Sequence, residues 1–220
     1  MNITNNIVAA YIDELYRSSN ADLQNLRDES KQNHVPIIQK DAENLLKVIM
    51  NLKKPAKVLE IGTAVGYSSC VFSECCGCEV TSIELDENVA ETARANIERL
   101  GFSDKIEVLV GDGRDVIKEL QNGDLSSESD KYDILFIDAA KSHYRDFWDL
   151  SQPLLNDGAM IICDNVLQKG MTASDEFDTR GRYKTSIRHM RNFISYITDL
   201  DDYDTVVLPI ADGISISIRK

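Results

Sequence analysis

Residues 57–69 read KVLEIGTAVGYSS and contain the transition on which the architecture of the chain depends. Lys57–Ile61 has the apolar character of a buried strand, and it runs directly into a turn with glycines at positions 62 and 66. A strand that passes through such a turn into a helix is typical of a parallel α/β sheet, in which ligands bind beyond the carboxyl ends of the strands. The residues at the strand ends are therefore the first candidates for function.

The same alternation of strand and helix continues along the chain. Further strands are expected at Glu79–Ile83, Ile106–Val110, Tyr132–Ile137 and Met160–Cys163. Helical patterns lie between them, most clearly at Glu87–Leu100 and Tyr144–Leu150, which predicts right-handed βαβ units. After a helix near Lys184–Thr198, two strands at Thr205–Leu208 and Ile214–Ile218 are joined by a link too short for a parallel crossover. We therefore expect an α/β fold with a mostly parallel seven-stranded sheet and a reversed strand at or near its edge.

The first 55 residues show a helical pattern of apolar residues instead of the strand and helix alternation, and this pattern predicts three helices. Thr4 can cap the first, which carries Ile7, Tyr11 and Leu15 on one face. The second and third are expected at Ala21–Gln32 and Gln39–Leu52. We expect one domain over residues 1–220, with an N-terminal helical segment at 1–55 and the α/β core at 56–220.

Composition excludes several classes of protein. The 220 residues carry 24 Lys plus Arg against 37 Asp plus Glu, a net charge of −13 that repels polyanions over most of the surface. No apolar run approaches the roughly 20 residues that span a bilayer, and the N-terminus lacks a signal-peptide pattern, so a cytoplasmic protein without a membrane partner is expected. The five cysteines lack the spacing of a zinc site or of a disulfide framework, and buried thiols are expected.

The first three strand ends predict a site for adenosine without a diphosphate. The dinucleotide pattern GxGxxG is absent because Ala64 stands in place of its second glycine, which argues against a nicotinamide dehydrogenase. Glu84 ends the second strand, where a carboxylate can accept hydrogen bonds from both ribose hydroxyls. Asp112, after the third strand, can accept from an adenine amino group.

The next two strand ends predict a cation site. Asp138 follows the fourth strand, and Asp164 and Asn165 follow the fifth. Neighbouring strands lie about 5 Å apart, so the three side chains can share one ion. Oxygen ligands suit Mg²⁺, Mn²⁺ or Ca²⁺ better than zinc, although Asp164-Asn165 alone could simply form a turn. Lys141, just beyond Asp138, can act as a general base, for which His143 is the weaker candidate.

Together these residues resemble the cation-dependent class I O-methyltransferases, the family that includes catechol and caffeoyl-CoA O-methyltransferases. The matching stretches are Val35-Pro36-Ile37, VLEIGTAVGYSS at 58–69, SIELDE at 82–87, GDGRD at 111–115, FIDAAKSHY at 136–144 and ICDNVL at 162–167. The resemblance implies a Rossmann-like methyltransferase fold, S-adenosylmethionine as methyl donor, Mg²⁺ (or Mn²⁺) as metal, and a homodimer with the N-terminal helices at its contact.

The resemblance also implies roles for individual residues. Val35 would line the methionine end of the donor, whose methionine portion Glu60, Gly62 and Ser68 would hold. The remaining implied donor contacts are Glu84 at the ribose, Asp112 and Gly113 near adenine, and Asp138. Asp138, Asp164 and Asn165 would bind the metal, and Asp138 and Lys141 would be catalytic. Val-Leu-Gln-Lys-Gly follows Asn165, without the tryptophans that flank the catechol pocket of the animal enzyme.

A basic segment bears on the substrate. Thr179–Asn192 carries five basic residues and no acidic one, in a chain of net charge −13. This tail, RYKTSIRHMRNF at 182–193 with TVVLPIADGISIS at 205–217, is similar to bacterial tRNA 5-hydroxyuridine methyltransferases. We therefore predict a tRNA anticodon loop as partner, held by Arg180, Arg182, Lys184 and Arg188, with Phe177 or Tyr183 stacking on an exposed base.

Four alternatives remain open at this level. The basic segment could pair with acidic surface elsewhere in the chain or bind a coenzyme A thioester. The acceptor could be a small catechol-like or caffeoyl-type phenol, because metal chemistry alone does not separate a catechol from 5-hydroxyuracil. The chain could also sense an adenosyl ligand without catalysis.

Overall fold

The computed structural model describes residues 5–220 and contains one seven-stranded sheet in the order β3-β2-β1-β4-β5-β7-β6. The strands are β1 Lys57–Ile61, β2 Glu79–Glu84, β3 Ile106–Val110, β4 Tyr132–Ile137, β5 Leu155–Cys163, β6 Tyr203–Leu208 and β7 Ile214–Arg219. All pairs from β3 to β5 are parallel, whereas β7 runs antiparallel to both β5 and β6. The predicted fold class is confirmed, and the reversed strand lies one place in from the edge.

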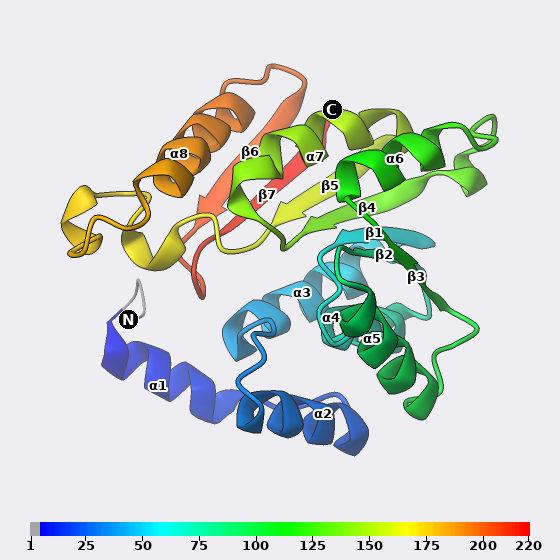
Figure 1. Cartoon of the computed structure of the whole chain (residues 1–220), viewed down its shortest axis with the longest axis horizontal. Coiled ribbons are helices and arrows are strands. Elements are labelled where there is room, and N and C mark those ends of the chain that lie inside the picture. The colour runs from blue at the N-terminus through cyan, green and yellow to red at the C-terminus, as the bar shows by residue number, and fades with distance from the viewer. Residues whose placement is uncertain (1–4) are drawn as a thin grey trace.

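Helices cover both faces of the sheet (Figure 1). On one face lie α3 Lys40–Lys53, α4 Tyr67–Cys76 and α5 Glu87–Arg99, with α2 Ala21–Gln32 packed outside them. On the other face lie α6 Gly113–Gln121, α7 Tyr144–Ser151 and α8 Lys184–Thr198. Because β1 to β5 are parallel, their carboxyl ends all lie at the same edge of the sheet.

The central strands β1 and β4 are mostly apolar because both faces of the sheet are buried there. In β4, Ile134 and Phe136 pack toward α3–α5, while Leu135 and Ile137 pack toward α6–α8. Trp148 of α7 is 1% exposed and sits in the second core. Two continuous cores therefore hold the sheet rigid beneath its functional edge.

Several boundaries differ from the predictions, most of them by one or two residues; β6, for example, begins at Tyr203 rather than Thr205. β5 begins at Leu155 rather than Met160, since Asn156-Asp157-Gly158 masks its first half in the sequence, and its register with β4 shifts between Tyr132 and Ile134. The third helix begins one residue later than expected, with Gln39 as its N-cap.

The first helix, α1 Asn6–Leu15, is capped by Asn5, and the predicted cap Thr4 lies outside the described residues. Its apolar side chains are turned to solvent, with Ile7 80% and Tyr11 62% exposed. Within residues 5–220, none of the helices combines the length and the apolar composition that crossing a membrane requires.

Candidate functional site

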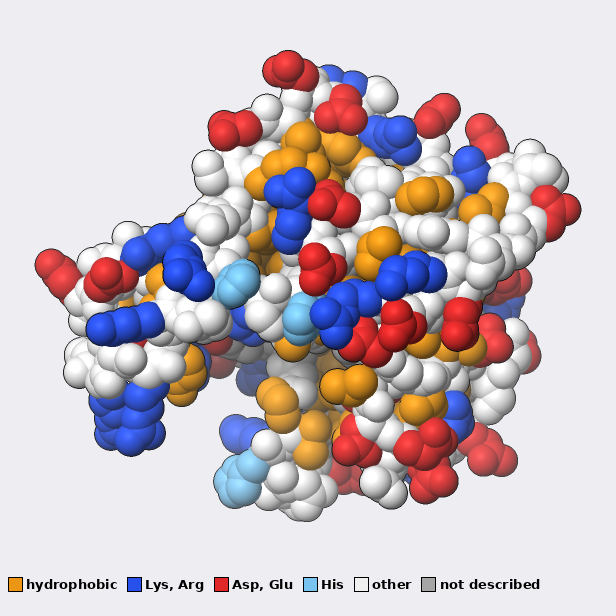
Figure 2. All heavy atoms as spheres, turned by 45° about the horizontal axis from the view of Figure 1, so that its top comes forward, with side chains coloured by type: hydrophobic (Ala, Val, Ile, Leu, Met, Phe, Trp, Pro, Cys, Tyr) orange, Lys and Arg blue, Asp and Glu red, His pale blue; other side chains and the backbone are white. Residues whose placement is uncertain are grey.

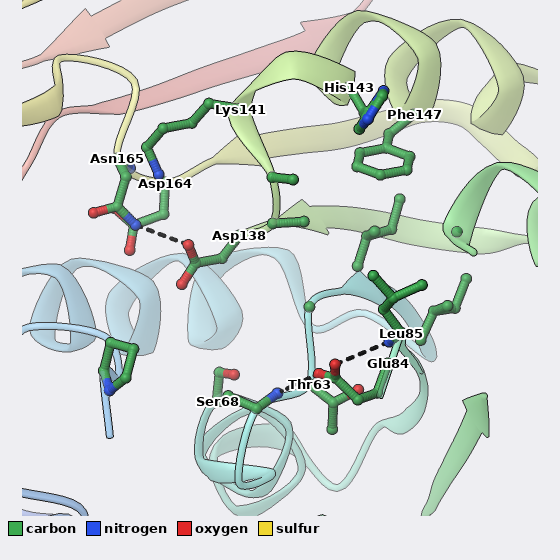
Figure 3. Close-up of a pocket in the computed structure, with 18 of the residues that line it drawn as sticks. Thr63, Ser68, Glu84, Leu85, Asp138, Lys141, His143, Phe147, Asp164 and Asn165 are labelled. Carbon is green, nitrogen blue, oxygen red and sulfur yellow. Dashed lines mark hydrogen bonds between the residues drawn. The ribbon is translucent and has the colours of Figure 1, made fainter. Parts of the chain in front are cut away.

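A cavity of about 980 Å³ lies at the carboxyl ends of β1 to β5, where the sequence placed the candidate residues. Its walls come from the turns after these five strands, from the first turn of α4 and from residues 36–39 between α2 and α3. Figure 3 shows the polar side chains of the site, which gather at two places, around Glu84 and around Asp138.

Gly62 joins these two places. Its φ is +103°, and a Cβ built there would lie 2.0 Å from the carbonyl oxygen of Asp138, so only glycine fits. The Gly62 amide donates to the carbonyl oxygen of Ile83 at 2.9 Å, and the Asp138 amide donates to that of Ile61 at 3.0 Å. The turn after β1 is thereby fixed to the ends of both β2 and β4.

Glu60 does not line the cavity, unlike the direct donor contact that the family resemblance implied. Its carboxylate is fully buried beneath the glycine turn, where it accepts hydrogen bonds from the hydroxyls of Ser68, Ser69 and Ser82. Burial raises the pKa of Glu60 to about 7, and the three hydroxyls oppose that rise. Ser68 itself does line the cavity, so Glu60 acts on this wall through the orientation of the serine.

Glu84 is held by backbone amides at the edge of the cavity. One carboxylate oxygen accepts from the Ala64 amide at 3.0 Å, and the other accepts from the amides of Leu85 and Asp86 at 2.9 and 3.1 Å (Figure 3). These contacts fix the direction of the carboxylate and leave acceptor capacity mainly on the oxygen that accepts from Ala64. That oxygen can accept a further hydrogen bond from a ligand hydroxyl.

Asp112 and Gly113 border the same end of the cavity. Asp112 caps α6 by accepting from the Arg114 amide at 2.9 Å, and its ion pair with the Arg114 side chain holds the pKa of its carboxyl well below the usual range. A Cβ at Gly113 would lie 2.9 Å from Phe147, so this glycine lets the ring approach the sheet closely. Phe147 offers an apolar surface to a flat ring in the cavity.

Asp138, Asp164 and Asn165 line the same part of the cavity, just beyond the ends of β4 and β5. The Asn165 side-chain amide donates to a carboxylate oxygen of Asp138 at 2.8 Å, although the two residues come from different strands (Figure 3). Asp164 is 3% exposed, and its backbone carbonyl accepts from the Tyr144 hydroxyl at 2.8 Å. Asn165 has a φ of +60°, which turns the chain sharply after β5 and brings the amide toward Asp138.

Burial raises the pKa values of both carboxyls, that of Asp164 to about 8, and repulsion by Asp138 adds to the effect on Asp164. The Lys141 ammonium opposes these shifts on both. In Figure 3 the Lys141 side chain reaches toward Asp164 and Asn165. His143 lies beside Phe147, with Nδ1 3.2 Å from a carboxylate oxygen of Asp146, and Figure 3 places it away from Asp138.

Three charged residues that line the cavity were not predicted from the sequence, namely Arg114, Lys169 and Asp212, and one predicted residue, Val35, lies outside its wall. Asp212, in the turn between β6 and β7, lines the cavity, and its charge raises the pKa values of Asp138 and Asp164. Lys169 lines it from the loop after Asn165. Val35 is absent from the wall because it packs against the core, and the wall begins at Pro36. The Asp-Gly pair in a short turn at the same sheet edge could have indicated Asp212.

The basic segment continues from the loop that follows Asn165. Gln168 of this loop and Ser186 of α8 exchange two hydrogen bonds of 3.3 Å. Arg191 is used internally, in an ion pair of 2.7 Å with Asp175. The other four basic side chains are exposed and form no ion pair within residues 5–220: Arg180, Arg182, Lys184 and Arg188. Figure 2 shows Lys and Arg side chains gathered at one end of the molecule, and Phe177 and Tyr183 are 49% and 52% exposed.

Comparisons with known proteins agree with this geometry. Residues 14–220 match a family model described as O-methyltransferase. A catechol O-methyltransferase of Mycobacterium tuberculosis is 33% identical over 133 residues, 59% of this chain and 57% of that protein. A Staphylococcus aureus structure, provisionally described as a caffeoyl-CoA O-methyltransferase, is 28% identical with a TM-score of 0.88, over 98% of this chain and 100% of that one. The O-methyltransferase from Bacillus cereus, solved in complex with SAH, is 24% identical with a TM-score of 0.82, over 97% of both chains.

Proposed function

We propose, since the chain belongs to the O-methyltransferase family, that it transfers a methyl group from S-adenosylmethionine to the 5-hydroxyl of wobble 5-hydroxyuridine in tRNA, giving 5-methoxyuridine. The observation that carries methyl transfer is the single cavity in which an adenosine-type site at Glu84 and Asp112 adjoins the oxygen ligands Asp138, Asp164 and Asn165. The tRNA acceptor is supported by the exposed basic side chains beside that cavity.

S-adenosylmethionine supplies an electrophilic methyl group on a sulfonium. In the proposal, Glu84 accepts from a ribose hydroxyl, and Phe147 with Asp112 and Gly113 borders the adenine. The glycine turn at Gly62 and the Ser68 hydroxyl hold the methionine portion. Fixing donor and acceptor in line can lower the barrier by about 7–11 kcal/mol.

The residues around Asp138 fit a divalent cation such as Mg²⁺ or Mn²⁺. Two buried carboxylates with raised pKa values are mutually repulsive, and a dication offsets that repulsion. The ligand set is small, because within residues 5–220 no three His, Cys, Asp or Glu side chains gather into a metal cluster. The Asn165 amide is therefore needed as the third ligand, with its oxygen turned toward the ion.

The bound dication would stabilise an oxyanion on the acceptor. In 5-hydroxyuracil, O5 neighbours the O4 carbonyl oxygen, so both oxygens could lie toward a cation held by Asp138 and Asn165. Lys141, whose side chain reaches toward these ligands, is proposed to lose its ammonium proton to solvent and then, as the neutral amine, to take the proton from the 5-hydroxyl.

The basic segment supplies the tRNA contact in this proposal. Arg180, Arg182, Lys184 and Arg188 can bind phosphates of the anticodon loop, and Tyr183 or Phe177 can stack on an unpaired base. Gln168 and Ser186 tie this surface to the loop that carries Asn165. A wobble base turned out of its loop would then reach the cavity while its backbone stays on the basic surface.

A small catechol-like or caffeoyl-type phenol is the second candidate acceptor, favoured by the substrates named for the relatives from Mycobacterium tuberculosis and Staphylococcus aureus. The deciding experiment is mass spectrometry of nucleosides from tRNA that lacks the modification, before and after incubation with protein, donor and Mg²⁺. A parallel assay uses a panel of catechols and caffeoyl-CoA. Appearance of 5-methoxyuridine supports the first acceptor, whereas turnover of phenols with no change in the tRNA rejects it.

Two variants test the parts of the proposal. Asp138→Ala should remove the response to Mg²⁺ and most activity while the chain still folds, and wild-type turnover would contradict both the metal site and catalysis by this cavity.

Neutralising Arg182, Lys184 and Arg188 together should weaken tRNA binding and flatten its salt dependence without changing donor affinity. If the salt dependence of tRNA affinity is the same in this variant and in wild type, the proposal that tRNA binds this surface is refuted.

We also propose a homodimer with α1 in its contact. Ile7, Tyr11 and Leu15 lie on one face of this helix, at 80%, 62% and 56% exposure. A second copy that covers this face would bury apolar area that now meets water. Light scattering after size exclusion should give a dimer for the wild type and a monomer for Ile7→Glu with Tyr11→Glu, and a wild-type monomer would refute the contact.

A further inference from the structure

Behind the cavity wall lies a buried ion pair that no step of the proposed reaction uses. Arg27 of α2 is 8% exposed and Glu43 of α3 is 0% exposed, and the two side chains form a direct salt bridge. Burying two charges brings little net stability compared with apolar packing. The contacts of the pair therefore indicate what else it does.

The guanidinium of Arg27 reaches both structural elements that form this side of the cavity. Its Nη2 donates to the backbone carbonyl of Ile38 at 3.0 Å, and Ile38 belongs to the wall at residues 36–39. Its Nε donates to the hydroxyl of Tyr67 at 3.1 Å, and the guanidinium lies 4.7 Å from the centre of that ring. Tyr67 lines the same cavity from the first turn of α4.

Glu43 completes the arrangement from the other side. One of its oxygens accepts from the Tyr67 hydroxyl at 2.8 Å as well as from Arg27, and the other accepts from the Tyr16 hydroxyl at 2.8 Å. The planar fork of arginine can serve the Ile38 carbonyl, the Glu43 carboxylate and the Tyr67 hydroxyl together, which a lysine ammonium on a flexible stem does less well.

We propose that Arg27 is a positioning residue for the methyl donor, because it fixes the wall at residues 36–39 and the Tyr67 ring relative to each other from behind the cavity. The proposal rests on the donor half of the proposed function and is independent of the acceptor. Loss of the guanidinium leaves the carbonyl of Ile38 without its buried donor, so the wall shifts and binds the donor less well.

The test measures binding of S-adenosylhomocysteine by titration calorimetry to wild type, Arg27→Lys, and Arg27→Met combined with Glu43→Gln. A single Arg27→Met change would leave the buried Glu43 carboxylate with the Lys47 ammonium, at 3.3 Å, as its one ion-pair partner within residues 5–220, so the double variant removes the charge of Glu43 as well. Its affinity should fall on the order of tenfold, as expected when a hydrogen bond from a charged donor is lost, and Arg27→Lys should fall less. The KM for the donor should rise while kcat at saturating donor changes little.

Arg99→Met is the matched control. Arg99 of α5 donates two hydrogen bonds, of 3.0 and 2.8 Å, to the carboxylate of Glu29, which lies in α2 like Arg27. Unlike Arg27, Arg99 is exposed and touches no part of the wall. This variant should bind S-adenosylhomocysteine like wild type. Amide hydrogen exchange at residues 37–39 should speed up in the double variant and not in Arg99→Met.

A purely structural ion pair predicts a different result. A double variant that is folded, as judged by the fluorescence of Trp148, and that binds S-adenosylhomocysteine within twofold of wild type would overturn the proposal. An equal loss of affinity in Arg99→Met would overturn it as well. Since this binding needs no acceptor, a failure to methylate tRNA leaves the result intact, whereas wild type that does not bind S-adenosylhomocysteine would refute the donor site itself.

Discussion

Replacing Glu60 by glutamine should change how the stability of the protein depends on pH. The carboxyl is fully buried, and burial raises its pKa from the usual 4.5 to about 7 against the effect of the hydroxyls of Ser68, Ser69 and Ser82. Between these two values the folded protein keeps the proton and the unfolded chain has released it. The free energy of unfolding of the wild type therefore falls as pH rises through this window, and the loss is complete above the folded pKa.

The size of the effect follows from the two pKa values. One pKa unit corresponds to about 1.36 kcal/mol, so the rise from 4.5 to about 7 amounts to roughly 3 kcal/mol for this group. A glutamine has no proton to release. The stability of Glu60→Gln relative to wild type should therefore increase with pH, by about 2 kcal/mol between pH 5.5 and pH 8, whatever the offset at low pH.

Urea unfolding at a series of pH values, without donor, measures this difference. Trp148, the only tryptophan of the chain, is buried and reports the transition by fluorescence. Titrating groups that do not interact with Glu60 are common to both proteins and cancel in the difference, whereas Asp138 and Cys70 are coupled to its charge. Glu98→Gln, which removes one charge from the exposed face of α5, controls for net charge. A difference that stays flat with pH, or that falls as pH rises, would refute the claim that desolvation outweighs the serine hydroxyls at Glu60.

Three further substitutions have defined outcomes. Gly62→Ala places a Cβ 2.0 Å from the Asp138 carbonyl oxygen at a φ of +103°. It should lower the free energy of unfolding by at least about 2 kcal/mol and abolish donor binding. Calorimetry that finds wild-type affinity for the donor would contradict the role of this turn. Asp212→Asn removes a negative charge that faces the proposed dication and should raise the Mg²⁺ concentration for half-maximal activity severalfold, so an unchanged Mg²⁺ titration would separate Asp212 from the metal. Trp148→Ala empties a site that is 1% exposed and should lower the free energy of unfolding by about 3–5 kcal/mol, measured by circular dichroism in urea; a loss below about 1 kcal/mol would mean that the core collapses around the gap.

Much of the fold was readable from local patterns. The apolar runs at β1 to β4 were predicted nearly to the residue, because strands covered on both faces stay rich in apolar residues even where a single polar side chain such as Glu60 interrupts them. The start of β5 was not, since Asn156-Asp157-Gly158 has the composition of a turn. Gly158 has a φ of +67°, and the register with β4 passes from the Tyr132–Leu155 pair to the Ile134–Met160 pair, so these residues form an irregularity within the strand. Strand ends located in this way also gave the two groups of side chains at Glu84 and Asp138.

What local patterns alone could not give is the set of contacts between distant segments. The family resemblance assigned Glu60 to the donor, but the three serines that surround its carboxylate come together only after β1, β2 and α4 pack. Asp212 and Arg27 went unnoticed for the same reason, since one arrives from the β6–β7 turn and the other from a helix outside the sheet. Alternation of apolar residues encodes which segments form strands and helices, because that depends on neighbours along the chain. Which charged groups end up buried together depends on neighbours in space, and these exist only once the two cores have closed around the sheet.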